Sequence, residues 1–103
     1  PLFFGNTSDF QQLYLQIPET ATTVMLRLEQ MPYIDQSGLY AIEDMLQDLK
    51  VKQIEVLFVG LQDQPKYMME RIDIIPDFIP IAHVFETFDA CVSWVKENVK
   101  DEF

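Results

Sequence analysis

The residue with the clearest potential for chemistry is Ser37, which lies between a strand-like and a helix-like segment. Asp35 precedes it by two positions, Gln36 stands between them and Gly38 follows. A hydroxyl at the start of a helix is placed to contact or receive a phosphate, because free backbone N–H groups and the helix dipole favour negative charge there. The structural alternative is that Ser37 or Asp35 only caps the helix, a contribution of about 1 kcal/mol. By itself, the local pattern favours capping.

The other reactive side chains do not combine into a recognisable catalytic or metal site. His83 is the only histidine and lies in an apolar stretch, so we interpret it as a structural strand residue. Cys91 is the only cysteine and is interpreted as a small core residue of the last helix. A Cys91–His83 pair remains an alternative, although nothing in the local sequence supplies a third, orienting group. We therefore expect no catalytic residues, no cofactor and no metal, and we interpret the carboxylates at positions 43, 44 and 48 as a solvated helix face.

The charge balance excludes several classes of partner. The chain has 103 residues, with 7 Lys and Arg against 17 Asp and Glu, a formal net charge of −10. Nucleic-acid binders need clustered Lys and Arg to neutralise phosphates, and anionic lipid surfaces attract basic segments. Hence neither nucleic acid nor direct lipid binding is expected. No Walker-type run accompanies the three glycines, and the negative field of the chain opposes tight nucleotide binding.

Length and composition predict one folded domain over residues 1–103. Hydrophobic residues make up 49% of the chain, too many for an acidic disordered tail. The sequence begins with Pro1, so we expect a fragment of a longer chain, with the first strand or strands upstream. The longest apolar runs are about four residues and a membrane helix needs roughly 20, so the fragment itself is expected to be soluble.

The apolar periodicity alternates between strand and helix along the chain. Strands are predicted at 2–4, 22–28, 54–59 and 81–85, and helices at 10–17, 39–49, 65–71 and from 88 onward. This order predicts an α/β fold in which a mostly parallel sheet of about four strands alternates with four helices. The loop 33–38 then lies beyond the carboxyl end of a strand, where sites form in such sheets.

The segment 67–81 contains more large apolar residues than a short helix and loop can readily bury. Two prolines within 73–80 predict irregular structure there. The surplus indicates either an interaction surface or a well-buried loop, and the sequence does not distinguish the two.

The loop between the second strand and the second helix resembles that of the STAS domain family. Bacterial anti-sigma-factor antagonists share this family with the cytoplasmic tails of SulP-type sulfate and anion transporters. The family loop is Asp-Ser-Ser-Gly or Asp-x-Ser/Thr-Gly, followed by an apolar helix. Asp35, Ser37 and Gly38 match it, whereas Gln36 departs at the first Ser.

Further segments extend the resemblance over essentially the whole chain. The opening Pro1-Leu2-Phe3-Phe4-Gly5 is similar to the stretch before the first helix in the transporter branch. Val56-Leu57-Phe58-Val59-Gly60-Leu61 is similar to the family's buried strand and following loop, and His83–Ala90 is similar to the start of its last helix.

The resemblance implies a non-enzymatic regulatory domain on the cytoplasmic side of the membrane, belonging to a bacterial SulP-type transporter. Its partners would be the membrane domain of the same chain and a cytosolic protein at the Ser37 loop and helix. The alternative is a free-standing anti-sigma-factor antagonist, in which Ser37 holds the place of the phosphorylated serine. Weak nucleotide binding is also implied by the family, and the acidic charge argues against it. We further expect Gly38→Val to harm the domain more than Ser37→Ala, through a close backbone approach or an unusual dihedral at Gly38.

Overall fold

Four parallel strands form one sheet in the computed structural model, which describes residues 2–5 and 10–99. Their spatial order is β1-β2-β3-β4, the same as their order in the sequence, and each neighbouring pair is parallel. The strands are β1 (Leu2–Gly5), β2 (Thr23–Arg27), β3 (Glu55–Val59) and β4 (Val84–Phe85). The predicted α/β fold with a parallel sheet is confirmed.

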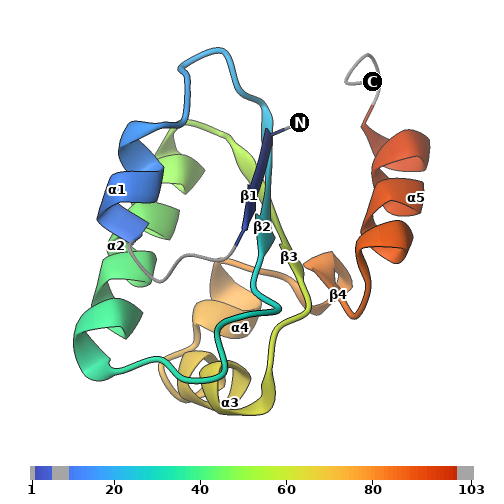
Figure 1. Cartoon of the computed structure of the whole chain (residues 1–103). Helices are drawn as coiled ribbons and strands as arrows, with labels where there is room; N and C mark the ends of the chain where they lie inside the picture. The colour runs from blue at the N-terminus through green and yellow to red at the C-terminus, as the bar shows by residue number, and fades with distance from the viewer. Residues whose placement is uncertain (1, 6–9, 100–103) are drawn as a thin grey trace.

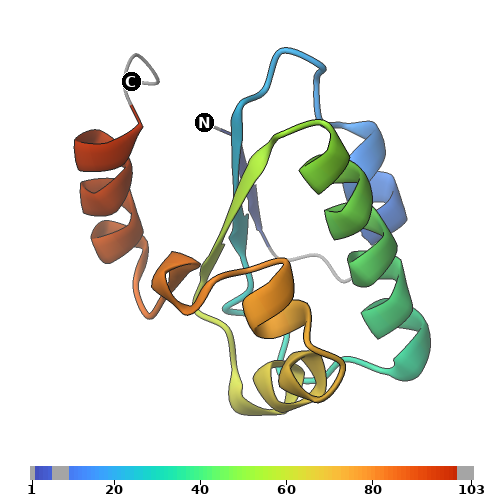
Figure 2. The ribbon, with the colours of Figure 1, turned by 180° about the vertical axis from the view of Figure 1, so that it is seen from behind.

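Helices cover both faces of this sheet. They are α1 (Phe10–Leu15), α2 (Gln36–Val51), α3 (Asp63–Arg71), α4 (Ile74–Asp77), the 3₁₀ turn η1 (Ile81–His83) and α5 (Phe88–Asn98). Figure 1 shows α1 and α2 on one side of the sheet and α5 on the other, with α3 and α4 near the carboxyl ends of the strands. The same arrangement is seen from behind in Figure 2.

Alternate strand residues supply two separate cores. On the α1–α2 face, Val24 and Leu26 of β2 and Phe58 of β3 pack in the larger cluster. On the opposite face, Met25 packs with α5. A strand buried on both faces must be apolar throughout, which explains the continuous apolar runs of β2 and β3.

The apolar stripe predicted for the second helix is confirmed. Leu39, Ile42, Leu46 and Leu49 of α2 are each at most 3% exposed. Met45 joins them on the same face, because it lies three positions from Ile42 and four from Leu49. This stripe fixes how α2 lies on the sheet and hence where its N-terminus points.

One local prediction is confirmed and one is wrong in the last third of the chain. Segment 73–80 is irregular as predicted, since the short turn α4 contains Ile75 in a non-helical conformation (φ −106°, ψ 118°); Ile74, Ile75 and Ile79 bury their side chains in the larger core. The strand predicted at 81–85 is the wrong one. Residues 81–83 form a 3₁₀ turn and only Val84–Phe85 pair as a strand. His83 is therefore a turn residue that precedes the strand.

The apolar surplus in segment 67–81 is mostly buried. Met69, Ile74, Ile75 and Ile79 are at most 5% exposed, which supports the interpretation as a well-buried loop. Ile81, at 75% exposure, and Tyr67, at 57%, are the exceptions. Within the described part of the chain, no helix is long and apolar enough to cross a bilayer.

Candidate functional site

Asp35 is the residue that caps α2. Its backbone is extended, with φ −90° and ψ 178°, and its Oδ1 accepts a hydrogen bond from the Gly38 backbone N–H at 2.8 Å. The Leu39 N–H donates to the Asp35 carbonyl at 2.9 Å and closes the first turn. The structure thus decides between the two predicted capping residues in favour of Asp35.

Ser37 lies in the first turn of α2, and its hydroxyl is not used to cap the helix, because Asp35 makes the cap hydrogen bond. The residue is exposed, and no hydrogen-bond partner for it is found among residues 2–5 and 10–99. A phosphate on this hydroxyl would stand near the positive end of the helix dipole. The side chain is therefore accessible for contact or modification.

Gly38 has an ordinary helical conformation, so no unusual dihedral angle requires a glycine there. The close approach of a neighbouring side chain is what limits the residue at this position. A Cβ at Gly38 would lie 3.1 Å from Cγ1 of Ile34, and Ile34 is 3% exposed. The unusual dihedral occurs instead at Gly60, with φ +70°. There a Cβ would lie 2.4 Å from Cγ of Glu29.

The loop that carries Ser37 is fastened by the start of α3. The Gln64 side chain accepts a hydrogen bond from the Ile34 N–H at 2.8 Å and donates one to the Ile34 carbonyl at 3.0 Å. Gln62 donates from Nε2 to the Glu29 carbonyl at 2.6 Å. Sequence reasoning missed both glutamines, since a polar pair after a strand has no local pattern that identifies its distant acceptor.

Three exposed tyrosines lie on the loop and helices at this end of the sheet. Tyr33 is 65% exposed and Tyr40 is 49% exposed, and the Tyr40 hydroxyl accepts from Gln36 Nε2 at 3.0 Å. Tyr67 lies one turn after Gln64 on α3, so it belongs to the same end of the sheet. We name this surface the Ser37 face and define it by Tyr33, Gln36, Ser37, Tyr40 and Tyr67. Exposed tyrosines are typical of protein-binding surfaces.

Arg27, at the carboxyl end of β2, makes an ion pair with Glu29 and a cation–π contact with Phe88 of α5. Arg27 donates to Glu29 at 2.6 Å, and its guanidinium carbon lies 4.4 Å from the centre of the Phe88 ring. The hydrogen bond from Arg27 holds the pKa of the Glu29 carboxyl below its usual value.

Cys91 and His83 both pack against other residues of the fold. Cys91 is completely buried, and burial raises its thiol pKa to about 11. His83 packs edge-on against Trp94, with ring centres 5.0 Å apart. Among the described residues, no three His, Cys, Asp or Glu side chains lie close enough to hold a metal ion.

Comparison with known proteins identifies the family. The family model described as the STAS domain matches residues 1–91. The chain belongs to the STAS domain family. No curated protein matches the sequence significantly.

Two solved structures share this STAS fold. A sulfate transporter family protein from Wolinella succinogenes superposes with a TM-score of 0.80 at 19% identity, covering 93% of this chain and 84% of that one. The SulP transporter STAS domain from Vibrio cholerae gives a TM-score of 0.72 at 22% identity, covering 91% and 78%. At these identities the similarity establishes a common fold.

Proposed function

We propose that this STAS domain is a regulatory, protein-interaction domain of a SulP-type sulfate or anion transporter, on the cytoplasmic side of the membrane. The observation that carries the proposal is the Ser37 face, which presents exposed tyrosines and, on a capped helix, a hydroxyl that has no partner among the residues the structure describes. The two structural neighbours, both from sulfate or SulP transporter families, support the transporter assignment.

The Ser37 face has the physical character of a docking surface. Its backbone is held in place by the Asp35 cap and by the paired hydrogen bonds of Gln64, so binding would cost little ordering entropy. Tyrosine side chains supply large contact areas with few rotatable bonds. A partner with a basic face is favoured, because the chain carries a net charge of −10.

We further propose that the domain acts without catalysis, cofactor or metal. Ser37 has no base within its hydrogen-bond reach among the described residues, and the buried thiol of Cys91 is held in its neutral form. A covalent mechanism needs a nucleophile and a base in contact. Turnover of an ester or nucleotide that disappears in Ser37→Ala would overturn this part of the proposal.

The gene upstream of Pro1 tests the transporter assignment. The proposal expects about ten or more apolar spans of roughly 20 residues each to be encoded there. A start codon within a few tens of residues, with no such span, would contradict it and favour the alternative.

The alternative is a free-standing anti-sigma-factor antagonist that is switched by phosphorylation. The exposed Ser37 hydroxyl at the start of α2 favours it, because a kinase can reach this group without unfolding the helix. Phosphate would add about −1.5 to −2 charges to the Ser37 face. Intact-mass analysis after incubation with the cognate kinase should then show one added phosphate in the parent and none in Ser37→Ala.

A further inference from the structure

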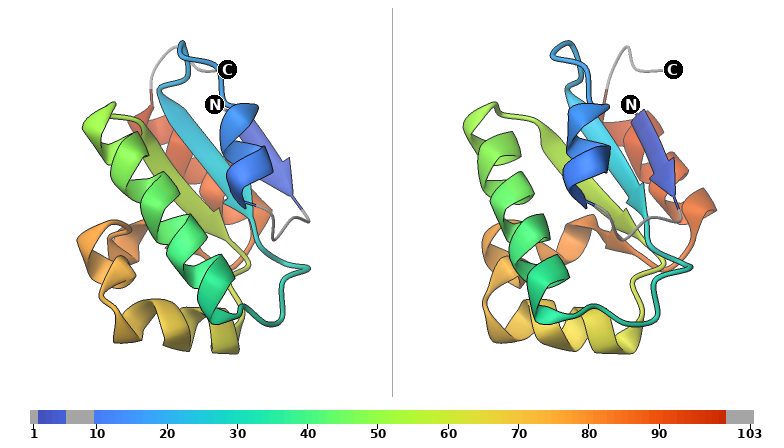
Figure 3. Two further views of the ribbon diagram at one scale, coloured as in Figure 1. Left: turned by 90° about the vertical axis from the view of Figure 1, so that its left-hand side faces the viewer. Right: turned by 60° about the vertical axis from the view of Figure 1, so that its left-hand side comes forward.

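A groove between α1 and α2 forms a second surface feature, one helical turn beyond Ser37. Its volume is about 300 Å³. The described residues that line it are Phe10, Tyr14, Leu15, Ala41, Asp44, Met45 and Asp48. Figure 3 shows α1 beside α2 on the same face of the sheet. Because α1 has 6 residues and α2 has 16, the shorter helix flanks only part of the longer one.

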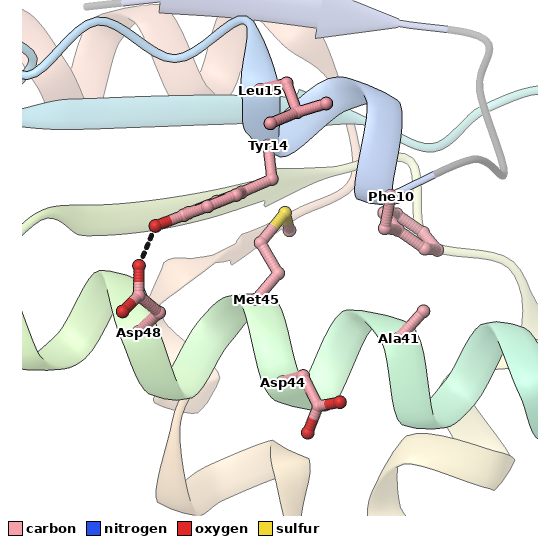
Figure 4. A pocket seen from close by; sticks show the side chains of 7 residues that line it. All are labelled: Phe10, Tyr14, Leu15, Ala41, Asp44, Met45 and Asp48. Carbon is pink, nitrogen blue, oxygen red and sulfur yellow. Dashed lines mark hydrogen bonds between the residues drawn. The ribbon is translucent and has the colours of Figure 1, made fainter.

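The interior of this groove is apolar and one wall of it is exposed. Phe10 is 1% exposed and Met45 is 5% exposed, whereas Leu15 on the α1 wall is 76% exposed. Figure 4 shows Leu15 and Phe10 on the α1 side, with Met45 between the two helices. Covering Leu15 would remove apolar surface from water, which is favourable in proportion to the area buried.

The α2 wall of the groove is acidic. Asp48 is engaged by the Tyr14 hydroxyl and by Lys52, whose Nζ lies 3.0 Å from Asp48 Oδ2. Asp44 is exposed and has no ion pair with any residue of the described part of the chain. A ligand that places a cation at Asp44 would gain this unused carboxylate.

The charge and the shape of the groove between α1 and α2 indicate which kind of partner can occupy it. A second copy of this chain would bring another −10 charges, and an anionic membrane would be repelled in the same way. The α2 wall presents Ala41, Asp44, Met45 and Asp48, at the i, i+3, i+4, i+7 spacing of one helical ridge. A helix laid along this ridge has the matching periodicity.

We propose that the groove docks a basic amphipathic helix of a partner protein. Apolar residues of that helix fill the space between Leu15 and Met45, and a Lys or Arg one turn away pairs with Asp44. This inference does not rest on the transporter assignment or on the Ser37 face.

A labelled peptide tests the proposal with the 103-residue chain. The probe is a fluorescein-labelled amphipathic peptide of about 15 residues, built from Leu, Ala and Lys with the leucines on one helical face. Its counterpart carries Glu at every Lys position. Fluorescence anisotropy at about 0.15 M salt, where long-range attraction is screened, should show binding of the Lys peptide and none of the Glu peptide.

Matched variants separate groove binding from general charge attraction. Asp44→Lys and Leu15→Ser should each weaken binding about tenfold. Glu97→Lys makes the same charge change on exposed α5, and Val51→Ser truncates an equally exposed aliphatic residue, so both should change binding less than about twofold. Tyr33→Ser, on the Ser37 face, should also leave it unchanged. Circular dichroism checks that every variant is folded.

Three results would overturn the proposal. They are an absence of peptide binding, an equal loss in Asp44→Lys and Glu97→Lys, and self-association of the chain that Leu15→Ser abolishes. The last result would identify a second copy as the occupant of the groove. Because the three overturning results concern the groove and leave the Ser37 face aside, the function proposed above stands or fails separately.

Discussion

At the scale of single residues, Gly38 and Gly60 are each required for a different physical reason. Gly60 is required for its backbone, because φ +70° is strained for any residue with a Cβ. Gly38 is required only for space, because its backbone is helical and Ile34 lies close to it. The sequence identified Gly38 as special, but a positive φ at Gly60 has no signature beyond a glycine after a strand.

Gly60→Ala should therefore be strongly destabilising. The left-handed conformation costs about 1–2 kcal/mol, and the new methyl group also displaces Glu29 from beneath it. We expect a loss of about 2 kcal/mol or more in the free energy of unfolding by urea. Gly38→Ala is the control and should cost less, because alanine favours the helix and offsets the tight contact. An equal loss in the two variants would contradict the assignment.

Gly38→Val should destabilise the domain more than Ser37→Ala. A branched side chain at position 38 must push Ile34, a buried residue, out of its packed position, at a cost of about 1–3 kcal/mol. The exposed Ser37 hydroxyl caps nothing, so its loss should stay within about 0.5 kcal/mol. Thermal melts of both variants beside the parent measure the difference. Equal melting temperatures would contradict the close approach.

Cys91 should be unreactive until the domain unfolds. Its pKa of about 11 leaves about 0.1% thiolate at pH 8, against about a quarter for an unfolded thiol with a pKa near 8.5. Labelling with a thiol-reactive dye should be slow in the native state and fast in guanidinium chloride. Rapid native labelling would show that the helix does not bury the thiol.

The same pKa predicts an alkaline loss of stability. Since the folded pKa is raised above the unfolded value, the stabilisation is complete below about pH 8.5 and declines as the pH rises toward 11. Cys91→Ala removes this contribution. The difference in unfolding free energy between parent and variant should therefore narrow from pH 8 to pH 10.5.

At the scale of elements, the helices that carry a periodic apolar face were predictable and the short segments were not. The stripe from Leu39 to Leu49 specifies α2, and the strands follow from their apolar runs. Segment 74–77 depends on the tertiary burial of Ile74 and Ile75, whereas the turn 81–83 buries none of its residues and is too short to show an apolar periodicity. The Ser37 loop was predictable as a strand-to-helix connection. Its fastening by Gln64 was not, because that contact joins residues 30 positions apart.

The Gln64 side chain should stabilise the conformation of the loop that carries Ser37, through its two hydrogen bonds to the Ile34 backbone. Gln64→Ala leaves the Ile34 N–H and carbonyl without their side-chain partner, which should cost about 1–3 kcal/mol. Gln47→Ala, an exposed change on α2, is the matched control and should cost little. Hydrogen exchange at the Ile34 amide should accelerate only in Gln64→Ala. An unchanged exchange rate would show that α3 does not fasten the loop.

At the scale of the whole molecule, the residues that stabilise the fold and the residues proposed to bind a partner lie in different places. Both faces of the sheet are buried by helices, while exposed tyrosines collect at the carboxyl end of the strands. The chain as a whole carries a net charge of −10, which favours partners with basic faces. The family and the parallel fold were predictable from the sequence, since the order of several weak motifs is specific even where each motif alone is not. The groove between α1 and α2 was not, because it depends on how two helices pack.

The most direct test of the proposed function is anion uptake by the full-length gene product in cells. Tyr33→Ser and Tyr40→Ser alter the Ser37 face without touching the cores, and Val51→Ser is the exposed control. At equal membrane levels, we expect radiolabelled sulfate or chloride uptake to change about fivefold or more in the tyrosine variants, the effect of a coupling near 1 kcal/mol. Val51→Ser should match the parent. Uptake that is unchanged in both tyrosine variants, or a full-length product that transports no anion, would contradict the account.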